Sequence, residues 1–110
     1  MSQDLLEVVK GPGPREFALA GELDASTVQT LVDALTAQHE QPGDIYLDLA
    51  DLLFVDSVGL SAFIAAARRL DGMGNLVLVS PKAEVERVLD VSGVDGMLPN
   101  LLVERGADRN

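Results

Sequence analysis

The stretch Leu52–Leu60 constrains the fold more than any other part of the chain. An apolar run ends at Asp56 and Ser57, and the chain then passes through Gly59 into a second apolar, alanine-rich segment. This order predicts a buried strand region, a tight turn and the start of a helix. The turn leaves the Ser57 hydroxyl at the helix N-terminus, where backbone N–H groups lack intrahelical acceptors and the helix dipole is positive. Ser57 can cap this helix, Asp56 is a cap or a solvated loop acid, and a phosphate added to Ser57 would meet an anion site.

Short aliphatic segments alternate along the chain with segments of helical periodicity. The sequence predicts strands at Leu5–Val9, Arg15–Ala20, Asp44–Leu49 and Leu76–Val79, with Ala50–Asp56 as a connection. It predicts one helix with an N-cap at Asp24 that stops before Pro42-Gly43, a second from Ser57 to about Asp71, and a third from Ser80-Pro81 to about Val91. Beyond Gly93 we expect a short strand at Met97–Leu98, a brief helical tail from Pro99 and a frayed end at 106–110.

This order of elements defines the fold class. The Gly/Pro-rich connection between the first two strands is short, which favours an antiparallel pair. Strands and helices then alternate, so we expect an α/β fold with a mixed sheet and helices packed against it. The 110 residues show no break in composition, which indicates a single domain over 1–110. Right-handed crossovers bring strand-to-helix turns to one edge of a sheet, so Asp24 and Asp56 should flank Ser57.

The composition narrows the classes of partner. The chain has 18 acidic and 8 basic residues and a formal net charge of −10. Because phosphate groups would be repelled, we expect no nucleic acid and no membrane as partner, whereas a basic protein suits this charge. No positively charged leader with an apolar core opens the chain, and no apolar run approaches the roughly 18 residues that span a bilayer. We therefore expect a soluble, cytoplasmic protein.

An enzyme is the first alternative class. Ser57 as a nucleophile would need a base within hydrogen-bond reach, and His39, the only histidine, lies in the wrong loop. The acids Asp48, Asp51 and Asp56 suggest a magnesium-dependent receiver, but we find neither the paired acids at the first strand's end nor the late lysine that it requires. The chain lacks cysteine and a second histidine, so a metal site is not expected. The sequence predicts no enzyme, no cofactor and no metal.

Three segments, taken together, resemble the STAS domain, the family of bacterial anti-sigma factor antagonists. Gly21–Ala25 resembles the family's strand-to-helix turn. Ile45–Leu49 followed by Phe54–Leu60 resembles its central strand and phosphorylation loop, and Leu76–Val79 leads into Ser80-Pro81 at the right distance afterward. The resemblance covers essentially the whole chain and implies a STAS-type mixed β-sheet.

The resemblance also implies a partner switch with Ser57 as the phosphorylated residue. In this family the unphosphorylated form binds an anti-sigma factor and frees a sigma factor. The anti-sigma factor is often a GHKL-type serine kinase that phosphorylates the serine and ends the interaction, and a phosphoserine phosphatase restores it. We expect Gly59 to keep side-chain bulk out of the kinase's approach. The expected partner-binding residues are Asp24, Asp56, Ser57, Val58, Gly59, Leu60 and Ala62.

Some alternatives stay open at this point. Many family members have a second hydroxyl after the acceptor, where this chain has Val58, so Ser61 is the nearest rival acceptor. The alanines of the second helix, such as Ala62 and Ala65, suit either a partner-facing edge or close packing of the helix on the sheet. A STAS module can also belong to a stress-signalling assembly or serve as an accessory subunit of a lipid transporter.

Overall fold

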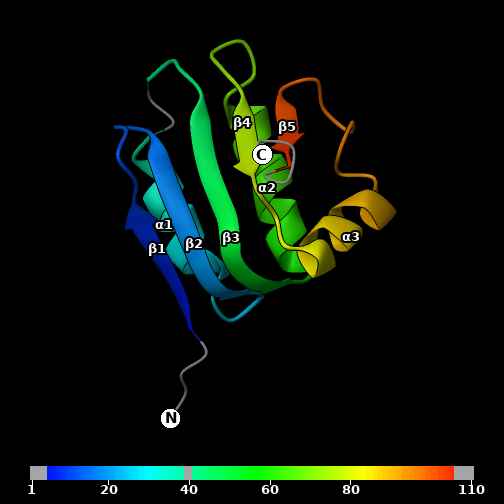
Figure 1. The fold of residues 1–110 in the computed structure, drawn as a ribbon. Helices are drawn as coiled ribbons and strands as arrows, with labels where there is room; N and C mark the ends of the chain where they lie inside the picture. Colours follow the sequence, from blue (N-terminus) through cyan, green and yellow to red (C-terminus); the bar gives the residue numbers. More distant parts are fainter. Residues whose placement is uncertain (1–4, 39–40, 106–110) are drawn as a thin grey trace.

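The computed structural model describes residues 5–38 and 41–105, which form strands and helices in the predicted alternation (Figure 1). In chain order the elements are β1 (Leu6–Lys10), β2 (Glu16–Leu23), α1 (Val28–Thr36), β3 (Ile45–Val55), α2 (Ser57–Arg69), β4 (Leu76–Val79), α3 (Ala83–Ser92) and β5 (Leu101–Glu104). His39 and the expected frayed end at 106–110 lie outside the described residues.

The strands form a single sheet whose spatial order follows the chain order from β1 to β5. β1 and β2 are antiparallel, and the β2–β3, β3–β4 and β4–β5 pairs are parallel. One helix connects the strands of each parallel pair. In Figure 1, α1 and α2 lie behind the sheet and α3 lies on the side where β5 forms the edge. The predicted α/β fold with a mixed sheet is therefore confirmed.

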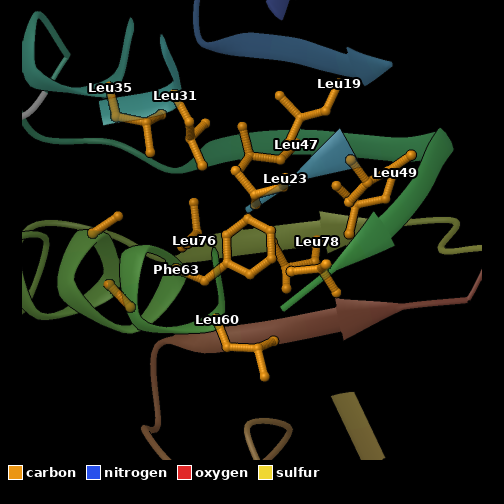
Figure 2. Packing of buried hydrophobic residues seen from close by; sticks show 14 of the residues in the cluster. Leu19, Leu23, Leu31, Leu35, Leu47, Leu49, Leu60, Phe63, Leu76 and Leu78 are labelled. Atoms are coloured by element: carbon orange, nitrogen blue, oxygen red, sulfur yellow. The ribbon is translucent and has the colours of Figure 1, made fainter. Parts of the chain in front are cut away.

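Leucine side chains from the sheet and from the helices build the core, which agrees with the low aromatic content of the chain. Along the first half of β3, Ile45, Leu47 and Leu49 are fully buried and alternate with exposed residues. Phe63 of α2 is also fully buried, and Figure 2 shows its ring among leucines of β2, β3 and β4. Burial of such apolar surface contributes roughly 25 cal/mol per Å² and holds the helices on the sheet.

The second half of β3 is irregular, and here the prediction is wrong. The connection expected at Ala50–Asp56 does not exist, because the strand continues to Val55. Its pairing with β2 shifts register twice, and each shift leaves one extra residue on β3, which is the pattern of a β-bulge. After Leu49 the next buried residues are therefore Leu52 and Val55, three positions apart each time. The bulges change which side chains this end of the strand exposes.

The region from β4 onward also differs from the prediction. Met97 and Leu98 lie in a turn, and the segment expected to be helical contains β5 instead, with Leu101 paired to Leu76. Ser80 does not cap a helix: its φ is 56°, and α3 begins only after Lys82 in the N-cap position. The predicted strand at 97–98 and helical tail are wrong because pairing with the sheet edge decides the structure of these residues.

Arg105 follows β5 and joins its end to α3. The guanidinium forms a salt bridge with Glu86, and its Nη2 lies 3.0 Å from Asp90 and 3.3 Å from Asp95. These groups are partly exposed, so each pair contributes little alone, but one cation shared by three carboxylates forms a network. The contacts attach the last strand to the helix before it.

Candidate functional site

The turns after β2 and β3 meet at one edge of the sheet, as expected. Leu23, the last residue of β2, pairs with Val55, the last residue of β3. The backbone N–H of Asp56 donates a hydrogen bond of 3.2 Å to the carbonyl of Leu23. Asp24 and Asp56 therefore follow two adjoining strand ends, and Ser57 comes directly after Asp56.

Asp56, and not Ser57, caps α2. Its backbone is extended (φ −110°, ψ −173°), and its Oδ1 accepts hydrogen bonds from the N–H groups of Val58 at 2.9 Å and Gly59 at 3.0 Å. Ser57 is the first residue of the helix, and its side chain is exposed. Of the two candidate caps the structure has Asp56, and Ser57 does not cap the helix because the aspartate one position earlier already satisfies the free N–H groups.

This cap changes the electrostatics expected for phosphorylated Ser57. The N–H groups that would attract a phosphate already bind the carboxylate of Asp56. A phosphate would bring about −1.5 to −2 charges next to that carboxylate. The site is therefore less favourable to an anion than the bare N-terminus of a helix.

Asp24 orders the neighbouring turn without capping α1 directly. Its Oδ1 accepts hydrogen bonds from the Ser26 hydroxyl at 2.8 Å and from the backbone N–H groups of Ser26 at 2.9 Å and Thr27 at 3.2 Å. The Ser26 hydroxyl, followed by the Ser26 N–H and then by the hydroxyl and N–H of Thr27, lowers the pKa of Asp24 below its ordinary value. The predicted N-cap is displaced: Thr27 occupies the cap position, and α1 starts at Val28.

Gly59 is buried beneath the helix start and does not widen the approach to Ser57. A Cβ at this position would lie 2.7 Å from Cγ of Leu23 and 2.8 Å from Cγ2 of Val55, closer than real side-chain atoms approach. The glycine therefore lets α2 rest directly on the ends of β2 and β3. Leu60 is also buried, so of the expected partner-binding residues these two contribute to the interior.

Two exposed apolar residues before the turn escaped the sequence-based prediction. Leu53 is 59% exposed and Phe54 is 47% exposed, although the sequence predicts a buried apolar run there. The second bulge of β3 causes this, because it places both residues between the buried positions Leu52 and Val55. With Val58, which is 39% exposed, they form what we call the apolar rim of Ser57. The only sequence signal was the loss of strict alternation after Leu49.

The alanines of α2 divide between packing and surface. Ala66 and Ala67 are buried, and Ala62 is half-buried against the core, which supports close packing of the helix. Ala65 is exposed and lines, with Ala62 and Val32, a small cleft of about 70 Å³ between α1 and α2. The burial of Ala66 and Ala67 fits close packing of the helix, and a partner-facing edge at Ala62 and Ala65 stays a prediction.

Neither a metal centre nor a membrane span is found within residues 5–38 and 41–105. In these ranges no three His, Cys, Asp or Glu side chains come together in a way that could hold a metal ion. None of the helices in the same ranges is both long and apolar enough to cross a membrane.

The fold and the strand-turn-helix site define the class of protein. Residues 6–105 match the family model described as the STAS domain, so the chain belongs to the STAS domain family. The membership implied by the sequence resemblance is confirmed.

Among curated proteins, the chain is similar to proteins named anti-sigma-B factor antagonist. The relative from Staphylococcus epidermidis is 27% identical over 85 residues, which cover 76% of this chain and 79% of the relative. The relative from Staphylococcus aureus strain NCTC 8325 has the same identity and the same coverage.

Solved structures share the fold. A crystal structure of an anti-sigma factor antagonist from Mycobacterium paratuberculosis has a TM-score of 0.79 at 23% identity and covers 92% of this chain and 88% of its own. The structure of the Bacillus cell fate determinant SpoIIAA in its phosphorylated form has a TM-score of 0.63 at 20% identity, with 94% and 95% covered. Unphosphorylated SpoIIAA has a TM-score of 0.62 at 19% identity, with 88% and 86% covered.

Proposed function

We propose that this protein is a cytoplasmic anti-sigma factor antagonist that switches partners through phosphorylation of Ser57. The observation that carries the proposal is the exposed Ser57 hydroxyl at the start of α2, directly after the capping Asp56, in a STAS domain. The names of the similar proteins and structures support an anti-sigma factor as partner. One of the similar structures is that of SpoIIAA in its phosphorylated form, which supports control by phosphate.

The partner is proposed to be an anti-sigma factor that is also a GHKL-type serine kinase. Binding to the unphosphorylated protein releases the sigma factor, and phosphate transfer to Ser57 ends the complex. A separate phosphoserine phosphatase returns the protein to its binding form. The protein is thus the substrate of both enzymes and needs no catalytic group of its own.

The switch is proposed to act at the interface and to leave the fold unchanged. Asp56 already caps α2, so phosphate on Ser57 has no free N–H groups of Val58 or Gly59 to reorganise. In a complex, however, a group of about −2 charge would lose its water beside Asp56 and Asp24. Electrostatic mismatches of this kind cost several kcal/mol, which corresponds to roughly a thousandfold loss of affinity.

The apolar rim is proposed to supply the favourable part of the interface. Leu53, Phe54 and Val58 lie within four residues of Ser57 along the chain, and each is more than a third exposed. Exposed leucine and phenylalanine side chains gain roughly 1.5–3 kcal/mol on full burial. A partner that covers the rim would therefore place its surface against the Ser57 hydroxyl, where a phosphate would prevent contact.

Titration calorimetry with purified GHKL-type anti-sigma factors from the same genome tests this function. The wild type and Ser57→Ala should bind equally, and Ser57→Asp should bind at least about a hundredfold more weakly. Ser61→Asp is the matched control, because it adds the same charge one turn further along α2 and should bind nearly as the wild type does. Equal binding by all four proteins would refute the charge switch, and mass spectrometry that places the phosphate on Ser61 or Ser26 would refute the site.

A further inference from the structure

The face of the sheet opposite the helices carries no helix in the part of the chain that the structure describes (Figure 1). The strand registers place two rows of side chains across this open face. One row joins Glu16, Tyr46, Val77 and Leu102, and the other joins Val9, Ala18, Asp48, Val79 and Glu104. The alternate residues of the same strands, such as Leu47 and Leu78, belong to the core on the helix side.

The open face combines apolar surface with a hollow. Tyr46 is 36% exposed and Leu102 is 41% exposed, and they lie on either side of Val77, which is itself buried at 3% exposure. Beside them is a hollow of about 280 Å³, lined by Glu16, Ala18, Tyr46, Asp48, Val79 and Glu104 and walled by the β1–β2 turn at Pro12. An aromatic and a leucine side chain that stay partly exposed beside a hollow are typical of a surface that binds another molecule.

The charge around the hollow has one sign. Glu16, Asp48 and Glu104 are carboxylates, and no described residue that lines the hollow is basic. Every salt bridge found within residues 5–38 and 41–105 is made by Arg105 to Glu86, Asp90 or Asp95, so none of them neutralises these three acids. Asp48 accepts a hydrogen bond only from the nearby backbone N–H of Ala50 among the described contacts. Within residues 5–38 and 41–105, the hollow therefore presents three carboxylates that no salt bridge compensates, beside the apolar side chains of Ala18 and Val79.

We infer that this open face docks a basic segment of a protein partner. The segment would insert an aliphatic side chain into the hollow and place Lys or Arg side chains on Glu16, Asp48 and Glu104. A second copy of this chain would bring like charges together, and nucleic acid or an anionic membrane would be repelled. A segment with both basic and aliphatic side chains is the occupant that complements the negative charge and the apolar lining of the hollow.

This surface is separate from the Ser57 site. Asp48 lies seven residues before Val55 on β3, which corresponds to about 20 Å along an extended strand. The hollow lies at the first halves of β2 and β3 and at the ends of the short strands β4 and β5, whereas Ser57 follows the end of the much longer β3. The protein can therefore hold a second partner while it exchanges the first, and Ser57→Asp should not affect binding at the open face.

The probe for this site is a fluorescein-labelled synthetic peptide of alternating lysine and leucine. Titrated into the ¹⁵N-labelled full chain, it should shift amide signals of Tyr46, Val79 and Leu102 and leave those of Ser57 and Val58 unchanged. A peptide with glutamate in place of lysine should not bind, and an all-lysine peptide should bind more weakly because it cannot fill the hollow. Shifts spread over the whole acidic surface would overturn the inference.

A pair of charge-matched variants separates the site from the general negative charge of the protein. Asp48→Asn with Glu104→Gln removes two charges at the hollow, and Asp33→Asn with Glu84→Gln removes two charges on exposed helix surface. The first variant should lose at least about tenfold in affinity, and the second should stay within about twofold. Urea unfolding of both variants confirms that they fold.

Three further results would contradict the inference. Equal losses in the two variants would mean that only the net charge of −10 attracts the peptide. Sedimentation that shows a dimer abolished by Tyr46→Ser would make a second copy the occupant. If the full chain bound phosphatidylserine vesicles and this binding depended on Asp48 in the same way, the occupant of the open face would be a lipid surface.

Discussion

Asp56 decides how α2 responds to phosphate on Ser57. Its carboxylate accepts the N–H groups of Val58 at 2.9 Å and Gly59 at 3.0 Å. A phosphate near the helix N-terminus gains about 0.3–1 kcal/mol from the dipole. Two like unit charges 4 Å apart in water repel by about 1 kcal/mol. Because the two effects are similar in size and opposite in sign, phosphorylation of the wild type should change the free energy of unfolding by less than about 1 kcal/mol.

Substitution of Asp56 separates the two effects. Asn caps a helix about as well as Asp, so Asp56→Asn keeps the cap but removes the repulsion. Phosphorylation of this variant should therefore stabilise it by about 0.3–1 kcal/mol. Asp56→Ala loses both hydrogen bonds and should lower the free energy of unfolding by about 1 kcal/mol. A phosphate on Ser57 should restore most of that loss, because the N–H groups of Val58 and Gly59 are then free to donate to it.

Urea unfolding followed by far-UV circular dichroism measures these differences when phosphoserine is encoded at position 57. The measurements belong at low ionic strength, and a repeat near 1 M salt should reduce the phosphate effects because the Debye length falls to about 3 Å. Asp71→Asn is the matched control, since it removes a charge at the other end of α2. The reasoning fails if phosphate stabilises the wild type as much as it stabilises Asp56→Asn, because the carboxylate would then not compete with it.

Three further predictions test other parts of the site. Gly59→Ala should lower the free energy of unfolding by about 1 kcal/mol, since overpacking outweighs the gain in helix propensity; a stabilised variant in urea unfolding would contradict the observed packing. Ser26→Ala should raise the pKa of Asp24 in an NMR titration. Because that pKa is lowered in the folded state, Asp24 stabilises the fold above its ordinary pKa and loses this effect as pH falls through the folded value. Ser26→Ala should therefore lose less stability on acidification than the wild type. An unchanged titration midpoint of Asp24 would contradict this. Leu53→Ser should weaken anti-sigma factor binding about tenfold or more in calorimetry, with unfolding unchanged, and unaltered affinity would remove the apolar rim from the interface.

Local patterns predicted the order of the elements and the neighbourhood of the site. Apolar alternation at Ile45–Leu49 and helical spacing from Leu60 to Ala67 are local signals, and each element formed where its own residues favour it. The meeting of Asp24 and Asp56 follows from the handedness of crossovers, which needs no knowledge of individual contacts.

The features that were missed depend on pairing between distant segments. The bulges of β3 arise from its register against β2, which no window of local sequence contains. β5 is a strand because Leu101 pairs with Leu76 at the sheet edge, although four residues are too few for a clear pattern. The choice between Asp56 and Ser57 as the cap stayed open for another reason: Asp and Ser are both good caps, and only the backbone geometry decides between adjacent candidates.

The same features explain why a charge at Ser57 should act on the partner and not on the protein itself. Gly59 lets the first turn of α2 pack directly against Leu23 and Val55. The helix start therefore cannot move away from a phosphate on Ser57 without exposing core residues. The bulges place Leu53 and Phe54 outside that core, four and three residues before Ser57, which begins the capped helix. The helix start is fixed by packing, and the added charge changes the stability of the fold little. Phosphorylation of Ser57 should therefore act mainly by lowering the affinity for a partner that covers the apolar rim.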